Sequence, residues 1–88
     1  MLIEFDPPKD MTNREKHGIS LSAAESINWE TALIRVDNRK HYAEDRFQAL
    51  GLLEARLYLV VFTVRGDALR IISLRKANKR EIKQYEQA

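Results

Sequence analysis

Basic side chains are concentrated in one stretch of the sequence, residues 65–83. This stretch holds seven lysines and arginines against two acidic residues, a net charge of +5, whereas the rest of the chain carries −3, for a total of +2. Such an uneven distribution predicts a surface for a polyanion rather than a uniformly basic protein. The alternative is that these charges only solvate the ends of a buried strand. The residues concerned are Arg65, Arg70, Arg75, Lys76, Lys79, Arg80 and Lys83.

The same stretch contains a hairpin that would set an aromatic ring beside an arginine. Gly66-Asp67 separates two apolar runs, which is a strong signal for a two-residue turn that pairs Val64 with Leu69. The continued register places Tyr58 opposite Arg75. A guanidinium can hold a phosphate through two hydrogen bonds and a ring can stack on a base, so this pair predicts binding of single-stranded RNA.

Three side chains near the C-terminus have the chemistry for RNA cleavage. In a helix, Glu81 and Tyr85 lie on one face with Arg80 at its edge. Cleavage by the 2′-hydroxyl of the RNA requires a group to take its proton, a cation for the charged phosphorane and a donor for the leaving oxygen. These residue types supply all three without a metal. The alternative is ordinary surface contact, since exposed pairs at this spacing are common.

The two histidines are further candidates for proton transfer, because histidine changes charge near neutral pH. His17 would close the first helix, where a histidine usually serves the helix dipole, and His41 would lie in a polar loop. Glu44 and Asp45 are adjacent in the sequence, so in a strand they point to opposite faces and cannot form the acid/base pair of a glycosidase.

Motifs and composition exclude most other classes of protein. There is no glycine-rich phosphate loop, nucleophile elbow or metal-binding helix motif. With no cysteine and two histidines, neither a disulfide framework nor a usual structural zinc site can form. We therefore expect no metal, no cofactor and a reducing cytoplasm as the location.

Length and hydropathy predict one compact domain over residues 1–88. The chain is 44% hydrophobic and 32% charged, which is typical of a folded protein and unlike a disordered one. The longest apolar run, residues 57–64, is far shorter than the roughly 20 residues needed to span a bilayer. The N-terminus also lacks the pattern of a signal peptide, so we expect no membrane role.

The elements that position these side chains follow from periodicity and from helix and strand breakers. We expect an α+β fold, with a twisted antiparallel sheet that carries helices on one face, an N-terminal helical hairpin and a C-terminal helix. The expected elements are a strand at 2–5, a helix from Asp6 through about His17 that Gly18 stops, a helical segment opened by Ser20, strands at 32–36, 46–51, 57–64 and 69–75, and a helix over 78–87 capped by Asn78.

Several short motifs resemble, in order and spacing, those of the BrnT toxins, and together they cover nearly the whole chain. They are Phe5-Asp6-Pro7 with Lys9, Lys16-His17-Gly18-Ile19-Ser20 before Ala23-Ala24, Glu44-Asp45-Arg46 with Leu50-Gly51, Arg65-Gly66-Asp67, the run from Leu69 to Ala77, and Lys79-Arg80-Glu81 with Tyr85-Glu86. The resemblance implies a RelE-like fold and a metal-independent ribonuclease that blocks translation.

The resemblance also implies a partner and a set of site residues. An antitoxin of the BrnA type would neutralise the toxin in a hetero-oligomer, with two toxin copies in the complex as an open option. That antitoxin would carry the DNA-binding part, so the toxin would reach DNA only through it. The active-site candidates carried over from the family are Arg46, Arg75 and Arg80, with His17 as a fourth.

The combined interpretation is a toxin ribonuclease. In it Arg75, Lys76 and Arg80 hold phosphate, Arg46 stabilises the transition state, and Tyr85, Glu81 or His17 moves protons. The rest of the expected RNA-binding surface consists of Tyr58, Arg70, Lys79 and Lys83. Two alternatives stay open: a non-catalytic module that binds nucleic acid or a partner, and an inactive relative kept for autoregulation.

Overall fold

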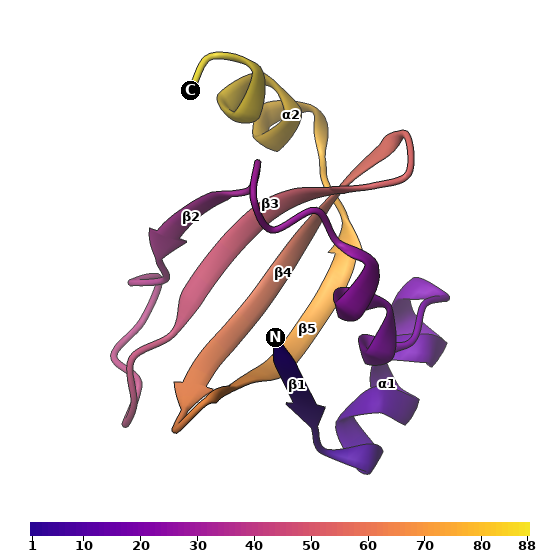
Figure 1. The fold of residues 1–88 in the computed structure, drawn as a ribbon, viewed down its shortest axis with the longest axis vertical. Coiled ribbons are helices and arrows are strands. Elements are labelled where there is room, and N and C mark those ends of the chain that lie inside the picture. Colours follow the sequence, from indigo (N-terminus) through magenta and orange to yellow (C-terminus); the bar gives the residue numbers. More distant parts are fainter.

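A computed structural model describes all 88 residues and contains one five-stranded sheet with helices packed against it (Figure 1). The strands lie in the order β1-β5-β4-β3-β2, so the long strand β4 is central, as predicted. No helix has both the length and the apolar character needed to cross a membrane. The elements are β1 (Leu2–Phe5), α1 (Pro7–His17), the 3₁₀ helix η1 (Leu21–Ser26), β2 (Leu33–Val36), β3 (Phe47–Leu53), β4 (Arg56–Arg65), β5 (Ala68–Lys76) and α2 (Lys79–Glu86).

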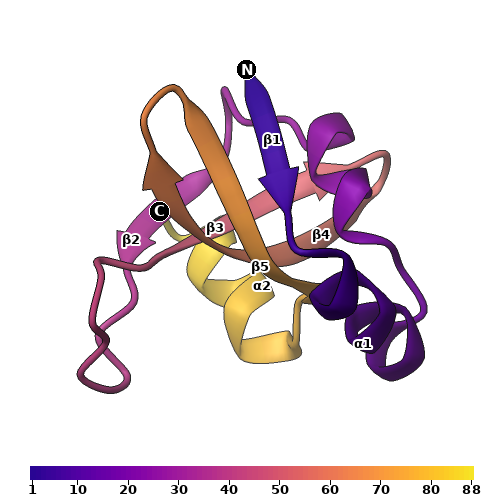
Figure 2. The ribbon, with the colours of Figure 1, turned by 90° about the horizontal axis from the view of Figure 1, so that it is seen from below.

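The sheet differs from the prediction in two respects. It is mixed rather than antiparallel, because β1 pairs with β5 in parallel while the other pairs are antiparallel. Helices also cover both faces rather than one, since η1 and α2 lie on opposite sides of the sheet (Figure 2). Successive side chains of a strand point to opposite faces of the sheet, so the strands can bury apolar residues on both faces.

The first helix agrees with its sequence signals, whereas the predicted second helix of a hairpin is wrong. α1 begins at Pro7 and ends at Gly18, which adopts the left-handed conformation with φ 71°. The segment after Ser20 is only a six-residue 3₁₀ helix. Leu21 and Ala24 of this helix and Ile27 directly after it recur every third position, which matches three residues per turn and places all three in the core.

The β4–β5 hairpin contains a bulge that changes the predicted register. Near the turn, Val64 pairs with Leu69 as expected. Farther along, Phe62 pairs with Ile71 but Val61 pairs with Ser73, so Ile72 is an extra residue in β5. From that point the pairing is displaced by one position.

The predicted pairing of Tyr58 with Arg75 is therefore wrong. Arg75 lies opposite Leu59, and Tyr58 lies opposite Lys76. Because successive side chains of a strand point to opposite faces, Arg75 faces α2 together with Leu59, whereas Tyr58 packs against the core on the η1 side. The ring and the guanidinium do not share a face.

The C-terminal helix begins as its sequence predicts. The Asn78 side chain accepts a hydrogen bond from the N–H of Glu81, and the Glu81 carboxylate accepts one from the N–H of Asn78. This reciprocal capping box satisfies two N–H groups that a helix start otherwise leaves without a partner. Tyr85 then packs against the buried cluster of Leu50, Leu57, Leu59 and Val61, which fixes α2 over one end of the sheet.

Candidate functional site

A cavity of about 360 Å³ lies between α1 and β5, and its lining is mostly polar and basic. α1 supplies residues at positions 9, 12, 13, 16 and 17, a spacing that places all of them on one helix face. β5 supplies the bulge residue Ile72 and its neighbour Ser73. The full lining is Pro8, Lys9, Thr12, Asn13, Lys16, His17, Ile72 and Ser73.

The basic side chains that line this cavity are not bonded to other side chains of the protein. Lys9, Lys16 and His17 are exposed and make no ion pair or side-chain hydrogen bond within the protein. Two ammonium groups and an imidazole thus face the same space as the Ser73 side chain. Such a set can hold an anionic group and can accept or donate a proton next to it.

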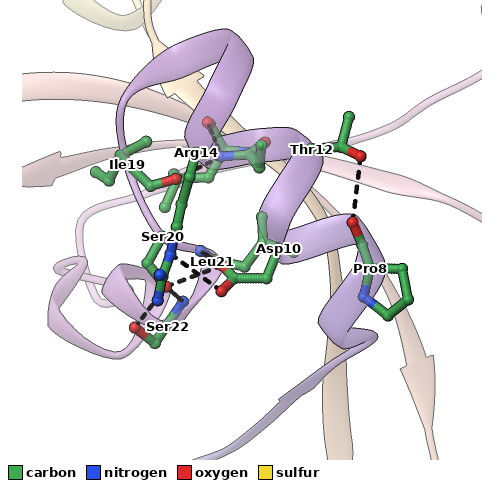
Figure 3. Close-up of polar contacts among 10 residues, drawn as sticks. Pro8, Asp10, Thr12, Arg14, Ile19, Ser20, Leu21 and Ser22 are labelled. Carbon is green, nitrogen blue, oxygen red and sulfur yellow. Dashed lines mark hydrogen bonds and ion pairs between the residues drawn. The ribbon is translucent and has the colours of Figure 1, made fainter.

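A polar network around Asp10 joins α1 to the segment that follows it (Figure 3). The Asp10 carboxylate accepts hydrogen bonds from the Leu21 N–H at 2.7 Å and the Ser20 hydroxyl at 2.9 Å, and its second oxygen lies 3.2 Å from Arg14 Nε. The Leu21 N–H bond is the main reason why the pKa of Asp10 is lowered, against the opposing effect of burial. The network joins α1 to η1 on the side of the helix away from the cavity.

Asn13 joins α1 to the sheet at the back of the cavity. Its amide nitrogen donates to the Leu74 carbonyl at 2.8 Å and to the Ile19 carbonyl at 2.9 Å, and its amide oxygen accepts from the Leu74 N–H at 3.1 Å. β1 pairs with β5 only as far as Ile71. Asn13 therefore completes the edge of β5 where β1 has ended, and holds α1, which carries His17, against the strand that carries Ser73.

Arg75 continues the basic surface along β5. Ser73 and Arg75 are two residues apart on the same face of the sheet, which separates their Cα atoms by about 7 Å. The Arg75 guanidinium forms two parallel hydrogen bonds of 2.9 Å with Glu81. Its side chain nevertheless keeps 30% of its exposure, so one edge of it is open to a ligand.

Glu81 is a buried anchor for Arg75 and α2. Burial alone would raise the pKa of Glu81, but the hydrogen bonds from Arg75 and from the Asn78 N–H outweigh it and hold that pKa below its ordinary value. The carboxylate therefore stays ionised, and both of its oxygens are already bonded. This environment suits a structural ion pair better than a proton acceptor near neutral pH.

Tyr85 and Arg46 lie away from the cavity. The Tyr85 hydroxyl donates to the Thr31 carbonyl at 3.1 Å, on the β2 side of α2. Arg46 lies at the start of β3, with its guanidinium carbon 4.2 Å from the centre of the Tyr42 ring, and β4 separates β3 from β5. The structure does not bring either residue together with Arg75 and His17.

Among the remaining predicted RNA-binding residues, one cation forms an ion pair with a carboxylate and four do not. Arg70 is half-buried and lies 3.4 Å from Glu4 on the neighbouring strand. Four others are exposed and make no side-chain hydrogen bond or ion pair; they are Lys76, Lys79, Arg80 and Lys83. Lys79, Arg80 and Lys83 extend the basic surface from Arg75 over α2, whereas Lys76 ends β5 and pairs with Tyr58 on the opposite sheet face.

Among the residues that line the cavity, sequence reasoning identified only His17 as a site residue. Lys9, Thr12, Asn13 and Lys16 were not predicted as site residues, although their spacing with His17 forms a polar stripe on a helix whose apolar residues are few. A stripe of that kind indicates a face kept for something other than the core. No three of the His, Asp and Glu side chains lie close enough together to hold a metal ion.

The comparison with protein families now adds to this geometry. The chain matches the profile of the ribonuclease toxin BrnT of type II toxin-antitoxin systems over residues 5–81. It belongs to this family. A search of the curated proteins finds no relative that matches it. Type II membership implies an antitoxin protein as partner, and the matched residues include every member of the α1–β5 cavity together with Arg75 and Glu81.

Proposed function

We propose that this BrnT-family chain is an endoribonuclease that cleaves RNA without a metal ion, with its reaction centre in the α1–β5 cavity. One observation carries the proposal: His17 shares the cavity with Lys9, Lys16 and Ser73, and Arg75 lies two residues beyond Ser73 on the same sheet face. The cavity is open, polar and positively charged, as a site for a phosphodiester must be. The cleavage of RNA would then inhibit translation.

The proposed reaction uses the 2′-hydroxyl of the RNA as nucleophile. Neutral His17 takes the proton of this hydroxyl, and the oxygen attacks the adjacent phosphorus. The positive charges of Lys16 and Arg75 stabilise the phosphorane oxygens. The bond from phosphorus to the 5′-oxygen breaks, and the ammonium group of Lys9 or Lys16 gives that oxygen a proton. The products are a 2′,3′-cyclic phosphate and a 5′-hydroxyl.

Among the proton carriers expected from the sequence, the geometry favours His17 over Glu81 and Tyr85. Both Glu81 oxygens and the Tyr85 hydroxyl are engaged in hydrogen bonds within the protein. In this proposal Lys79, Arg80 and Lys83 hold the flanking phosphates through charge alone. Arg46 has no part in it, because it lies just before β3. Tyr58 and Lys76 have none either, because they pair with each other on the opposite sheet face.

The biological setting remains part of the proposal. We infer a RelE-like fold, action in the cytoplasm and a BrnA-type antitoxin that neutralises the toxin in a hetero-oligomer. DNA binding would come from the antitoxin. These inferences are supported by membership of a type II toxin-antitoxin family and by the net positive charge of residues 65–83.

The test is a cleavage assay with purified protein and a labelled single-stranded RNA in the presence of a chelator. We expect cleavage with a 2′,3′-cyclic phosphate end, and a loss of about 100-fold or more in His17→Gln, the usual contribution of a general base. His41→Gln is the matched control. His41 is exposed in the loop between β2 and β3 and does not line the cavity, so this variant should retain full activity. RNA that is bound but never cut by the wild type would instead establish a non-catalytic binding module.

A further inference from the structure

The strand β2 forms a free edge of the sheet. It pairs only with β3, and no other strand or helix lies along its outer side (Figure 1). The Asp37 N–H donates to the Arg46 carbonyl at 2.7 Å, which makes these two residues a hydrogen-bonded pair of the ladder. In an antiparallel ladder such pairs alternate, so the N–H and C=O groups of Ile34 and Val36 point away from β3. They are available to another strand.

The side chains at this edge are apolar although they face water. Ile34 is 50% exposed and Val36 is 62% exposed. Val36 lies beside Phe47, which is half-buried, so the apolar surface continues onto β3. Open backbone groups together with exposed apolar side chains are typical of a surface that a partner covers. We call Ile34, Val36 and Phe47 the β2 edge patch.

The opposite face of the same strand indicates the charge of that partner. Arg35 points toward the α2 side of the sheet. Its guanidinium donates to the amide oxygens of Gln48 on β3 and Gln84 on α2, both at 2.8 Å. No carboxylate lies within ion-pair distance of it. The edge strand therefore presents, on its α2 face, a guanidinium without a direct ion-pair partner, and an acidic side chain on an added strand would meet it there.

A second copy of the chain fits this edge poorly. Consider two copies of the chain that pair their β2 strands about a two-fold axis. Ile34 and Val36 then both lie in the interface only when Ile34 of one copy pairs with Val36 of the other. That register puts Arg35 directly opposite Arg35, and like charges in that position are destabilising. The observations favour a different chain with an acidic residue flanked by apolar ones.

We propose that the antitoxin of this toxin-antitoxin pair adds a strand to the outer edge of β2. Its apolar side chains cover the β2 edge patch and an acidic side chain pairs with Arg35. The proposal rests on membership of a type II family and not on the cleavage mechanism, because β2 contributes nothing to the α1–β5 cavity.

The test measures binding of the purified cognate antitoxin to wild-type toxin and to the double variant Ile34→Lys/Val36→Lys. We expect affinity to fall by about 30-fold or more, the usual effect of changing residues that dominate an interface. Met11→Lys is the matched control, since Met11 is 64% exposed on α1, and it should bind normally. Arg35→Glu should also weaken binding, whereas Arg35→Lys should preserve most of it.

Two further readouts separate the alternatives. Hydrogen exchange of the Ile34 and Val36 amides should slow by about tenfold or more when antitoxin is added to wild-type toxin. Unchanged exchange, or undiminished affinity in the double variant, would overturn the proposal, as would a toxin dimer that Val36→Lys disrupts. RNA cleavage by the double variant should equal that of the wild type, so failure of antitoxin docking and failure of the ribonuclease proposal are distinguishable.

Discussion

The side chain of Asn13 binds both main-chain groups of Leu74, 61 residues farther along the chain. The amide takes the place that a strand residue would occupy at the edge of β5, and a third hydrogen bond to the Ile19 carbonyl holds the turn after α1. One buried side chain thus joins the helix that carries His17, the strand that carries Ser73 and the start of the 3₁₀ segment.

Asn13→Leu should destabilise the protein and impair cleavage. The substitution keeps the size of the side chain but leaves the buried N–H and C=O of Leu74 without partners, at a cost of about 2–4 kcal/mol in the free energy of unfolding. Urea denaturation measures this loss. Thr12→Ala is the control, because the Thr12 hydroxyl is exposed and should matter by less than about 0.5 kcal/mol. A stable, fully active Asn13→Leu variant would show that Asn13 does not position the cavity.

Arg75→Met should cost stability through the partner that it leaves behind. The buried Glu81 carboxylate would lose two hydrogen bonds, and because Arg75 itself is partly exposed we expect a loss of about 2 kcal/mol, below the range for fully buried pairs. Adding Glu81→Gln to Arg75→Met should restore part of the loss, since no unpaired charge then remains. Strictly additive losses in this double-mutant cycle would argue against coupling between the two residues.

An RNA cleavage assay distinguishes the structural role of Glu81 from the proposed catalytic role of Arg75. Glu81→Gln should retain most of the activity, because Glu81 holds α2 and Arg75 but touches no substrate in the proposed mechanism. Arg75→Met should lower cleavage by about 10²-fold or more if its guanidinium stabilises the phosphorane. Equal activities for the two variants would contradict a direct role for Arg75. Circular dichroism at the assay temperature checks that both variants are folded.

Acid should destabilise the protein through three carboxylates. The pKa of Asp10 is lowered by the Leu21 N–H, that of Asp37 by Arg39, and that of Glu81 by Arg75 and Asn78 against the opposing effect of its burial. A carboxylate with a depressed pKa in the folded state stabilises that state above its ordinary pKa, here 3.8 for aspartate and 4.5 for glutamate, and this stability is lost as pH falls through the lower folded values.

Urea midpoints at several pH values test this expectation. The wild type should have a flat profile above about pH 5 and a falling midpoint below the ordinary pKa values of the three carboxylates. Glu81→Gln should lose less stability over the acid range than the wild type, because it has one such group fewer. A wild-type midpoint that stays constant down to pH 2.5 would contradict the assignment.

Gly51→Ala should destabilise the sheet for a steric reason. Gly51 is buried in β3, and a Cβ there would lie 2.5 Å from the Ile27 Cγ2 methyl. Overpacking of this kind typically costs about 1–3 kcal/mol. Adding Ile27→Ala removes the clashing methyl, so the double variant should be less destabilised than the sum of the two single variants. Thermal unfolding of the four proteins gives the comparison, and additive losses would show that the clash relaxes without cost.

Some elements of the fold could be predicted from neighbouring residues alone. Pro7 begins α1, Gly18 ends it, Gly66-Asp67 turns the β4–β5 hairpin, and Asn78 with Glu81 begins α2. Each of these signals acts through backbone preferences or hydrogen bonds that reach at most four residues along the chain.

The layout of the site depended instead on contacts between distant segments. The extra residue Ile72 in β5 turns Arg75 toward α2 and separates it from Tyr58, and no local pattern revealed a bulge at that position. The bonds from Asn13 to Leu74 bring His17 beside Ser73, while β4 keeps Arg46 apart from both. Sequence by itself determined which residues could carry charge and protons and where helices and turns begin. Only the packed sheet decided which of them meet, because strand register and helix docking are set by the burial of the whole core rather than by the residues next to each group.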